Sequence, residues 1–411
     1  MGPGESDIIP EVKVCFETFG CRLNRAEALE EEARYLAAGW TLTKNHAEAD
    51  WIVVRGCSVT ARAQADCEKL VKHLKRKYPA KRVIVQGCLK EASPTVARRL
   101  PKDAPRNILE RKLAEVTDVP VPTRTARAYL KVQDGCSGKC TFCIVPSFRG
   151  KSTSVPFAQV MDKARRFIDA GYHEIVVTGC NLALYASEGR KFPQLLAALA
   201  ELGAADNRRC RIRIGSLEPG PCADETVRVM ADHGNICRFL HIPVQSMAER
   251  LLVAMQRPYR TKDVANLVDA AIRAIPDIGL GCDLMTGFPG ESDVDFLSTK
   301  TYLQRAPFSN VHVFPYSERP GTVAEKYQGS IPKEMRRIRA HELAKIADAK
   351  RQLFAQRFVH RDVEVVIEDE THQAGWTSEY LWYEPPHILQ HFARKELVTL
   401  PVHTCRHGKL H

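Results

Sequence analysis

Between residues 128 and 317 the sequence repeats one pattern, in which a short apolar stretch is followed by a segment long enough for a helix. The six candidate strands of this kind are 128–133, 173–179, 211–218, 239–245, 278–287 and 310–316. Repeated strand–helix units favour a parallel barrel, and six units instead of the usual eight predict a partial one. Its working face is expected at the carboxyl ends of the strands.

The segments on either side of this barrel predict two further domains. Residues 11–121 alternate apolar runs with helical stretches, which favours a small parallel α/β sheet. Asn24 followed by Glu27 resembles an N-cap with its capping box, so we expect a helix to begin there. A stretch rich in proline and threonine, 119–127, is a plausible linker, and the tail is expected to be a short β module. The predicted domains of this α/β chain are 11–121, 128–358 and 361–411.

Charge and apolar content restrict the class of protein. No run of about 18 apolar residues exists, and the first ten residues lack the pattern of a secretory signal, so we expect a cytoplasmic protein with no membrane partner. The net charge of +11 favours a polyanionic partner, although solubility alone would also account for it. The tail from Arg361 onward is acidic, because it contains five Lys or Arg against eight Asp or Glu, so it is not a simple basic patch.

Three cysteines of the first domain, Cys21, Cys57 and Cys88, share one context. Each follows an apolar strand and has a glycine directly before it. Residues just past the carboxyl ends of parallel strands converge on one crevice, so these distant cysteines could meet at a single metal centre. A glycine lets the backbone approach a bulky group closely. The alternative is that each thiol only fills space in the core.

A second set, Cys136, Cys140 and Cys143, lies on the loop after the first barrel strand. Zinc and closed iron–sulfur clusters normally take four protein ligands, and no nearby cysteine or histidine pair completes this set. Three ligands leave one corner of a metal centre open for a substrate or cofactor.

The other cysteines are weaker candidates. Without an export signal, the fourteen cysteines are better interpreted as thiols and metal ligands than as a disulfide framework. Cys405 could hold zinc with His403 and His407. Packing or an idle thiol is the expectation for Cys15, Cys67, Cys210, Cys222, Cys237 and Cys282.

The spacing C-x3-C-x2-C, with Phe142 before its last cysteine, resembles the hallmark of the radical S-adenosylmethionine (SAM) enzymes. Further stretches resemble, in order, the landmarks of the methylthiotransferase family, and these are FETFGCRLN, RGCSVT, QGCLK, IVPSFRGKSTSVP, VVTGCN, RIRIGSLEP, LHIPVQS and GFPGE. HVFPYSERPGT and GWTSEY most resemble the branch that acts on threonylcarbamoyladenosine in tRNA. In that branch the tail is a TRAM domain. RGCSVT departs from the Asn-Thr that usually precedes this cysteine, and the tail is short and acidic.

This resemblance implies two [4Fe-4S] clusters and SAM as cofactors. Cys136, Cys140 and Cys143 would hold the cluster that reductively splits SAM, and Cys21, Cys57 and Cys88 would hold an auxiliary cluster that carries the transferred sulfur. SAM would first methylate that sulfur, and a radical from a second SAM would remove hydrogen from C2 of adenine. The implied SAM contacts are Phe142, Thr178, Gly179, Ser216, Glu218 and Gln245. Each of the last three could equally be a satisfied polar residue of the barrel.

The expected partners are tRNA, at adenosine 37 of the anticodon loop, and an electron donor such as flavodoxin or ferredoxin. Two basic helical segments, 68–82 and 332–359, could contact tRNA phosphates, although a charged helical face is often only solvated. In the tail Trp376, Tyr380, Trp382 and Tyr383 could stack on unpaired bases or fill a core. We expect a monomer.

Three interpretations of the function remain open. The first is methylthiolation of threonylcarbamoyladenosine in tRNA. The second keeps the chemistry but changes the target to isopentenyladenosine in tRNA or to an aspartate of a ribosomal protein. The third is a metal-stabilised RNA-binding protein without catalysis.

Overall fold

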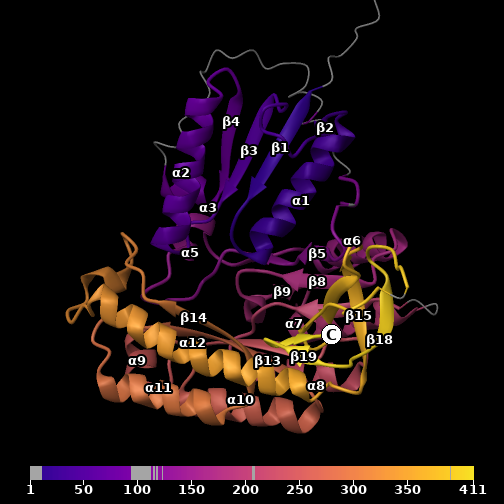
Figure 1. Cartoon of the computed structure of the whole chain (residues 1–411). Helices are drawn as coiled ribbons and strands as arrows, with labels where there is room; N and C mark the ends of the chain where they lie inside the picture. Colours follow the sequence, from indigo (N-terminus) through magenta and orange to yellow (C-terminus); the bar gives the residue numbers. More distant parts are fainter. Residues whose placement is uncertain are drawn as a thin grey trace, which may run out of the picture. The chain divides into compact units, whose positions relative to one another are not determined.

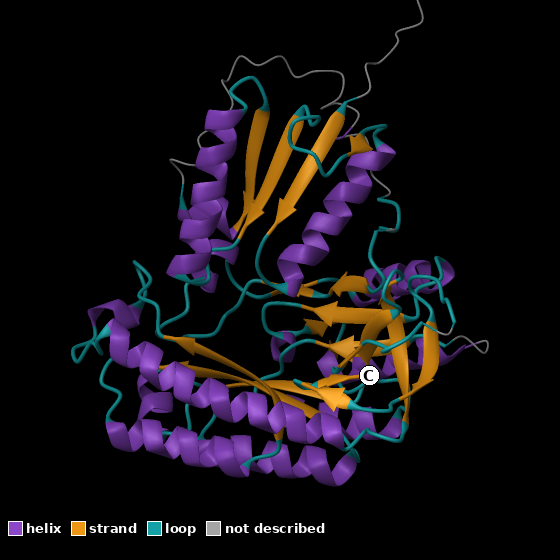
Figure 2. Ribbon diagram, in the orientation of Figure 1, coloured by secondary structure: helices purple, strands orange, loops and turns teal. Residues whose placement is uncertain are grey.

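The computed structural model of the chain describes residues 12–93, 113, 116, 119–122, 124–205, 209–388 and 390–411. The chain forms two compact units that divide between Arg124 and Thr125, inside the segment predicted as a linker. Figure 1 labels their elements and Figure 2 shows their helices and strands. Among the described helices, none has the length and apolar character needed to span a membrane.

The first unit is a parallel sheet with the strand order β2-β1-β3-β4. Its strands are β1 (Lys13–Thr18), β2 (Thr41–Leu42), β3 (Trp51–Gly56) and β4 (Arg82–Gly87), and its described helices are α1 (Arg22–Ala37), α2 (Ala61–Lys77) and α3 (Cys88–Ala92). Ile52 and Val54 pack with α2 residues, whereas Val53 packs with Tyr35 of α1. Successive side chains of β3 are therefore buried on opposite faces, which explains its unbroken apolar run. The predicted parallel α/β sheet is confirmed.

The predicted start of the first helix is wrong. Helix α1 begins at Arg22, with Cys21 as its N-cap residue, so Asn24 lies inside the helix. Asn24 is buried, and its Nδ2 donates to the carbonyl oxygen of Phe19 at 2.6 Å. The side chain is therefore used to fix the preceding loop, and this long-range role outweighs its local preference for a cap.

The second unit contains the six predicted barrel strands. They are β5 (Ala128–Lys131), β8 (Glu174–Thr178), β11 (Arg211–Ile214), β12 (Phe239–Gln245), β13 (Gly279–Thr286) and β14 (Phe308–Pro315). They form two three-stranded parallel sheets, β11-β8-β5 and β12-β13-β14, joined by the isolated parallel bridges Ile212–Ile236 and Ser216–His241. The partial parallel barrel predicted from the strand–helix repeats is confirmed.

Helices separate and cover these strands. The longer ones are α6 (Phe157–Asp169), α7 (Phe192–Ala204), α8 (Pro221–Asp232), α10 (Thr261–Ala274), α11 (Asp293–Arg305) and α12 (Lys333–Gln356). Short elements lie mainly in the loops, and they are β6 (Gln133–Asp134), α5 (Val145–Arg149), β7 (Thr153–Ser154), η1 (Leu182–Leu184), β9 (Ala186–Ser187), β10 (Arg190–Lys191), α9 (Glu249–Ala254) and η3 (Val323–Lys326). Ser292 caps α11 by accepting a hydrogen bond from the backbone nitrogen of Asp295.

The tail forms a sheet with the order β18-β15-β16-β17-β20-β19. Its strands are β15 (Asp362–Asp369), β16 (Ala374–Thr377), β17 (Trp382–Tyr383), β18 (Leu397–Pro401), β19 (Cys405–Arg406) and β20 (Lys409–Leu410). Its core includes Val365, Ile367 and Tyr383, together with Phe354 at the end of α12. The tail thus shares a core with the last helix of the barrel and belongs to the same compact unit.

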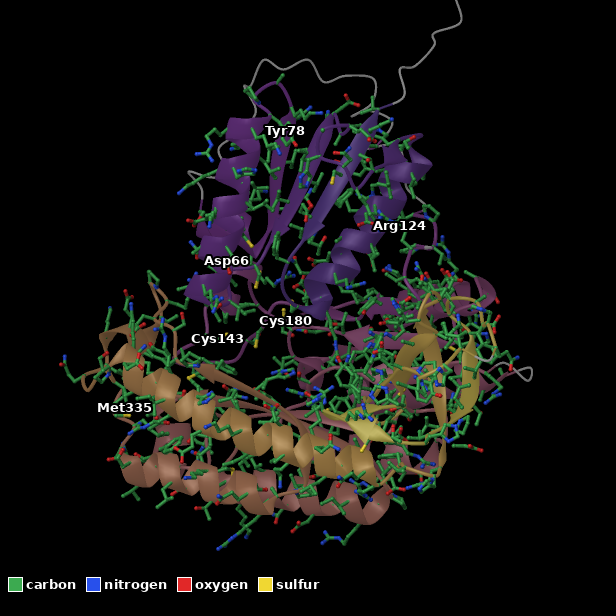
Figure 3. All side chains as sticks on the ribbon, viewed as in Figure 1. Asp66, Tyr78, Arg124, Cys143, Cys180 and Met335 are labelled. Carbon is green, nitrogen blue, oxygen red and sulfur yellow. The ribbon has the colours of Figure 1, made fainter. Side chains whose placement is uncertain are left out.

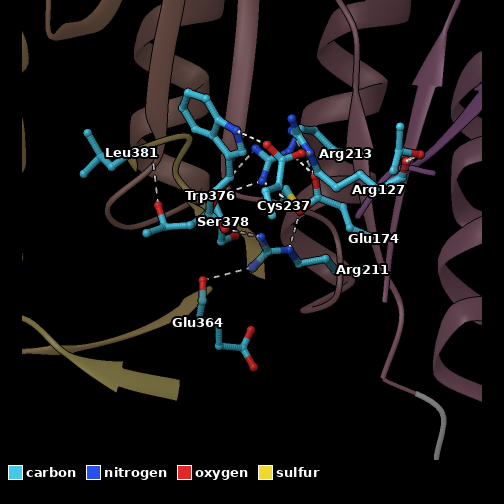
Figure 4. A network of polar contacts seen from close by, with 12 residues as sticks. Arg127, Glu174, Arg211, Arg213, Cys237, Glu364, Trp376, Ser378 and Leu381 are labelled. Atoms are coloured by element: carbon cyan, nitrogen blue, oxygen red, sulfur yellow. Dashed lines mark hydrogen bonds and ion pairs between the residues drawn. The ribbon is translucent and has the colours of Figure 1, made fainter. Parts of the chain in front are cut away.

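A buried polar network ties the barrel to the tail (Figure 4). Glu174 is fully buried at the start of β8 and accepts from the Nε atoms of Arg211 and Arg213, both at 2.7 Å. Arg211 also donates to the carbonyl oxygen of Trp376 at 2.6 Å, and Arg213 to that of Thr377 at 2.8 Å. Buried charges need such complete pairing, so these contacts fix the tail against the amino ends of β8 and β11.

Candidate iron–sulfur and cofactor sites

Cys21, Cys57 and Cys88 all lie at the carboxyl ends of first-unit strands. Cys21 precedes α1, Cys57 directly follows β3, and Cys88 opens α3 directly after β4. Gly56 and Gly87, which precede the latter two cysteines, pair across the sheet. Cys57 and Cys88 are buried, and Cys21 is exposed. The three cysteines therefore share the carboxyl edge of this sheet, and their meeting at one metal centre stays a prediction.

The glycines before these cysteines permit their close approach. A β-carbon on Gly20, which has φ +98°, would lie 2.7 Å from Cβ and 2.9 Å from Sγ of Cys57. A β-carbon on Gly87, with φ +68°, would lie 2.7 Å from Oδ1 of Asn24. Both positions thus require glycine for backbone conformation and for space. This is the physical reason for the Gly-Cys pairs in the sequence.

Asn24 joins the strand ends around the cysteines. Besides its bond to Phe19, its Nδ2 lies 3.3 Å from the carbonyl oxygen of Arg55 and 3.5 Å from that of Gly56. Its Oδ1 and the hydroxyl of Ser58 are buried without a hydrogen-bond partner in the described residues. Unpaired buried polar atoms of this kind are rare and often mark a place where a ligand binds. The sequence interpretation had assigned Asn24 to a helix cap and so missed it.

Electrostatics also link the three thiols of this site. Burial raises the pKa of Cys57, and the neighbouring Cys21 and Cys88 raise it further. Mutual repulsion among thiolates disfavours their ionised forms, whereas a bound cationic centre favours them. The set therefore suits a metal centre better than three free thiolates.

The second cysteine set lies on a loop that backbone contacts hold in place. Gly135 has φ +64°, and a β-carbon there would lie 2.1 Å from the carbonyl oxygen of Lys151. The backbone nitrogen of Cys136 donates to Gly150 at 3.0 Å, and Thr141 Oγ1 donates to the carbonyl oxygen of Ala254 at 3.0 Å. The loop is thus fixed on both sides before any cofactor binds.

Arg257 contacts this cysteine set directly. Its Nη1 donates to Sγ of Cys140 at 2.9 Å, and it also forms an ion pair with Glu218. Burial raises the pKa of Cys140, and the charge of Arg257 opposes that effect. Burial raises the pKa of Cys143 to about 11, and the other two thiols add to the increase. No sequence spacing connects Arg257 with the cysteines, so the sequence interpretation missed it.

The number of thiols in each set is informative about the kind of centre. In the described part of the chain, the groups of three ligand atoms that lie within 4.8 Å of one another are Cys15–Glu17–His46 and His241–Asp283–His312, and neither cysteine triad is among them. Each triad supplies three thiolates, which would hold a [4Fe-4S] cluster and keep one of its corners open. Cys405 is in neither group, and its sulfur instead accepts from Gln352 at 3.2 Å.

Three of the implied SAM contacts lie in closely packed surroundings, and these are Phe142, Thr178 and Gly179. Phe142 packs edge-on against Phe288, with ring centroids 6.5 Å apart. Thr178 is buried at the end of β8. A β-carbon on Gly179 would lie 2.8 Å from Oε1 of Gln133, so this glycine permits a close approach. Their contact with SAM stays a prediction.

The other three lie at the ends of β11 and β12. Ser216 is exposed and bridges to His241, while Glu218 pairs with Arg257 and accepts from Asn181 at 2.9 Å. Gln245 is buried with φ +63°, and its Oε1 has no hydrogen-bond partner among the described residues. A strained, unpaired side chain at a strand end fits a residue that binds a ligand.

Figure 3 labels Cys143 and Cys180. Cys143 lies on the loop with Cys136 and Cys140, which we call the triad loop, and Cys180 follows β8. The thiol of Cys180 lies 3.7 Å from Oδ1 of Asp134, in the strand that leads into the triad loop. The sequence interpretation had given Cys180 no role. Its position shows that the second strand of the barrel also contributes a thiol near this loop.

Comparisons with known proteins agree with this arrangement. Residues 130–303 match the Radical SAM superfamily, and residues 13–106 match the uncharacterized protein family UPF0004. A protein of Bacillus subtilis named threonylcarbamoyladenosine tRNA methylthiotransferase MtaB is 29% identical over 402 residues, which cover 90% of this chain and 89% of the relative. A protein of Cereibacter sphaeroides named tRNA-2-methylthio-N6-dimethylallyladenosine synthase is 30% identical over 388 residues, which cover 87% of each chain.

A solved structure shares the fold. The radical SAM methyltransferase TsrM from Kitasatospora setae aligns with a TM-score of 0.53 at 14% identity, over 74% of this chain and 72% of that one. Each of the two segments that match a family model, 13–106 and 130–303, contains one of the cysteine triads. This chain therefore belongs to the radical SAM methylthiotransferase family, whose members are enzymes that use [4Fe-4S] clusters and SAM to transfer a methylthio group.

Proposed function

We propose that this enzyme converts N6-threonylcarbamoyladenosine at position 37 of tRNA into its 2-methylthio derivative. The observation that carries the proposal is the pair of separate three-thiolate sites, one in each unit, in a chain that aligns almost end to end with relatives named for this reaction. One site would serve radical generation and the other would serve sulfur transfer.

Each site has protein groups suited to its task. Cys136, Cys140 and Cys143 would ligate the cluster that, with SAM bound, supplies the electron for reductive cleavage of the cofactor. Arg257 would offset the negative charge of the Cys140 thiolate through its hydrogen bond. Gln245, with its free Oε1, would bind a polar group of SAM.

The auxiliary site would bind the sulfur-carrying cluster. Cys21, Cys57 and Cys88 would be its ligands, and the glycines before them provide the space for close approach. Asn24 would hold the strand-end loops so that the thiols stay in place. Removing hydrogen from C2 of adenine requires a radical, because no side-chain base can take this unactivated proton.

Helix α2 is the proposed tRNA contact. Its exposed residues include Lys69, Lys72, Lys75 and Arg76, which form a basic face. Helix α12 is less suitable, because Arg336 and Arg339 are buried and bind Glu318 and Glu291. The tail aromatics are also partly engaged within the protein, since Trp376 stacks on Tyr380 at 4.5 Å. A cytoplasmic location, a monomeric state and a flavodoxin or ferredoxin electron donor remain parts of the proposal.

A second candidate substrate is dimethylallyladenosine in tRNA, because relatives named for that product are 30% identical to this chain. The test incubates anaerobically reconstituted enzyme, a reductant and SAM with tRNA that carries either modified adenosine. Nucleosides are then analysed by mass spectrometry. We expect the methylthio product from the threonylcarbamoyl tRNA and none with a Cys140→Ala variant. Product from the dimethylallyl tRNA alone would favour the second candidate, and product from neither tRNA would contradict both.

A further inference from the structure

Two sequence stretches that resemble the threonylcarbamoyladenosine branch meet at one cavity. The stretch 312–322 contributes His312 from β14, and the stretch 375–380 contributes Trp376 and Tyr380. The cavity has a volume of about 210 Å³, and its lining also includes Asn310, Asp348 and Arg351. Pockets for whole drug-sized ligands are usually about 300–1,000 Å³, so this one suits a side group better than a nucleoside.

One wall of the cavity is a rigid aromatic stack. Trp376 and Tyr380 are 4.5 Å apart with an interplanar angle of 12°, and Tyr380 stacks in turn on Phe239 at 4.6 Å. Arg213 lies over the ring of Tyr380 at 5.2 Å. Stacking of this extent fixes the rings, so the wall keeps its shape when a ligand enters.

His312 is oriented by a chain of polar contacts across three strands. Nδ1 of His312 lies 3.3 Å from Oδ1 of Asp283, and Nε2 of His241 lies 3.1 Å from Oδ2 of the same carboxylate. Gly281 makes room for this arrangement, since a β-carbon there would lie 2.5 Å from Nδ1 of His241. With Nδ1 donating to Asp283, the Nε2 edge of His312 is left to accept a hydrogen bond. The His312 side chain is 62% exposed, so a ligand can reach it.

Burial alone would raise the pKa of Asp283, but the hydrogen bonds from His241 and His312 outweigh it and place this pKa well below its usual range. Asp283 therefore stays ionised and keeps its role as acceptor for both rings. The backbone of His241 also forms a parallel β-bridge with Ser216, one of the residues implied in SAM binding.

Arg351 supplies an unused donor to the same cavity. Its Nε is buried and has no hydrogen-bond partner in the described residues. The side chain packs closely under Gly408, where a β-carbon would lie 2.5 Å from Cγ of Arg351. A guanidinium group with a buried Nε that lacks a partner is suited to a carboxylate, which such a group can bind through two parallel hydrogen bonds.

We propose that this cavity binds the threonyl end of the N6-threonylcarbamoyl group, with Arg351 pairing its carboxylate and His312 accepting a hydrogen bond from its hydroxyl. The inference rests on the proposed function and names the part of the chain that selects this substrate. A dimethylallyl group has neither a carboxylate nor a hydroxyl, so it would leave the buried Nε of Arg351 without a partner. Leaving a buried polar group unpaired is what makes such a site selective.

The test compares two substrates with the reconstituted holoenzyme. One is tRNA with threonylcarbamoyladenosine, and the other is the same tRNA with the threonyl carboxylate amidated. We expect wild-type kcat/KM to be at least about tenfold higher for the carboxylate, as a charge-assisted pair implies. Arg351→Gln should bring this ratio close to one by lowering only the rate with the carboxylate, and Arg351→Lys should restore part of it. His312→Ala should lower kcat/KM for both substrates, since the hydroxyl is common to them.

Arg337→Gln, an exposed substitution on the same helix, is the matched control and should keep the wild-type ratio. Iron content and melting temperature confirm that each variant folds. If the Arg351 variants do not fold, the kinetics of His312→Ala test the inference, because His312 is exposed. Wild-type kinetics in both Arg351→Gln and His312→Ala would overturn the inference while leaving the proposed function intact. A wild-type enzyme that does not modify threonylcarbamoyladenosine would overturn both.

Discussion

At the scale of single residues, the two cysteine sites depend on neighbours that carry no cysteine. Arg257 donates to Cys140, and Gly20 gives Cys57 its space. Neither residue ligates a metal, yet each controls a property of a ligand. Their effects can be separated, because one acts through charge and the other through packing.

Arg257→Gln is expected to shift the midpoint potential of the SAM-binding cluster to more negative values. The variant removes a charged donor from Cys140, and hydrogen bonds to cluster sulfurs stabilise the reduced state. The check is a redox titration followed by electron paramagnetic resonance, with iron content measured in parallel. Arg228→Gln, an exposed change on α8, should keep the wild-type potential. An unchanged potential in Arg257→Gln would show that the hydrogen bond has no electronic effect.

Gly20→Ala is expected to remove one cluster and leave the other. A β-carbon at this position would lie 2.9 Å from Cys57 Sγ, so the auxiliary thiols cannot keep their arrangement. Iron should fall from about eight to about four atoms per chain, while reductive cleavage of SAM persists. Gly39→Ala is a matched control, because Gly39 also has positive φ but has no atom within 4 Å of an added β-carbon. Full iron content in Gly20→Ala would contradict the assigned site.

At the scale of elements, the two basic helices α2 and α12 have different environments. Helix α2 exposes its lysines, whereas α12 buries Arg336 and Arg339 in ion pairs. Charge counts along a sequence cannot distinguish a solvated face from internal pairing, because the pairing partners come from distant loops. The exposed lysines of α2 are therefore the proposed phosphate contact.

Replacing Lys72 and Lys75 of α2 by glutamine is expected to weaken tRNA binding about equally for all tRNA sequences. Each lost phosphate contact should reduce the slope of log K against log salt by about 0.7 to 0.9. Fluorescence anisotropy with labelled tRNA at several salt concentrations measures both effects. Replacing Lys262 and Arg273 of α10, which are also exposed, should leave binding and slope unchanged. Equal behaviour of the two double variants would exclude α2 as the contact.

At the scale of the whole molecule, the buried carboxylate of Glu174 connects barrel and tail. Burial alone would raise the pKa of Glu174, but Arg213 and Arg211 outweigh it and place this pKa well below its usual range. A depressed folded-state pKa contributes stability above the unfolded value of about 4.3, and this contribution is lost as the pH falls below it. The assembly of the second unit should therefore weaken in acid.

Glu174→Gln is expected to lower the free energy of unfolding of the second unit by about 3 to 5 kcal/mol at pH 7, because it leaves buried guanidinium groups unpaired. The difference from wild type should become smaller as the pH falls from 5 toward 3. Urea unfolding followed by circular dichroism at several pH values measures this. Glu201→Gln, an exposed change on α7, should alter stability by less than about 0.5 kcal/mol. A difference in the free energy of unfolding that does not depend on pH would show that the ionisation of Glu174 does not cause the acid sensitivity.

The six barrel strands and the positions of the cysteines after strands were predictable because they depend on local patterns. Alternation of apolar runs with helix-length segments determines the strand–helix units, and the position of Cys57 and Cys88 just after strands follows from the sequence itself. Asn24 was predicted wrongly because two of its partners, Arg55 and Gly56, are distant along the chain and become neighbours only when the sheet forms.

The sequence by itself determined the strand–helix units and which cysteines follow strands, since both depend on residues that are near one another along the chain. Only the tertiary structure decided that Arg257 contacts Cys140 and that Glu174 pairs with arginines of β11. It also decided that His312 and Arg351 line one cavity. The contacts of Glu174 with Arg211 and of Cys140 with Arg257 join residues 37 and 117 positions apart. Their geometry depends on how strands and helices pack, and no spacing rule along the chain contains that information.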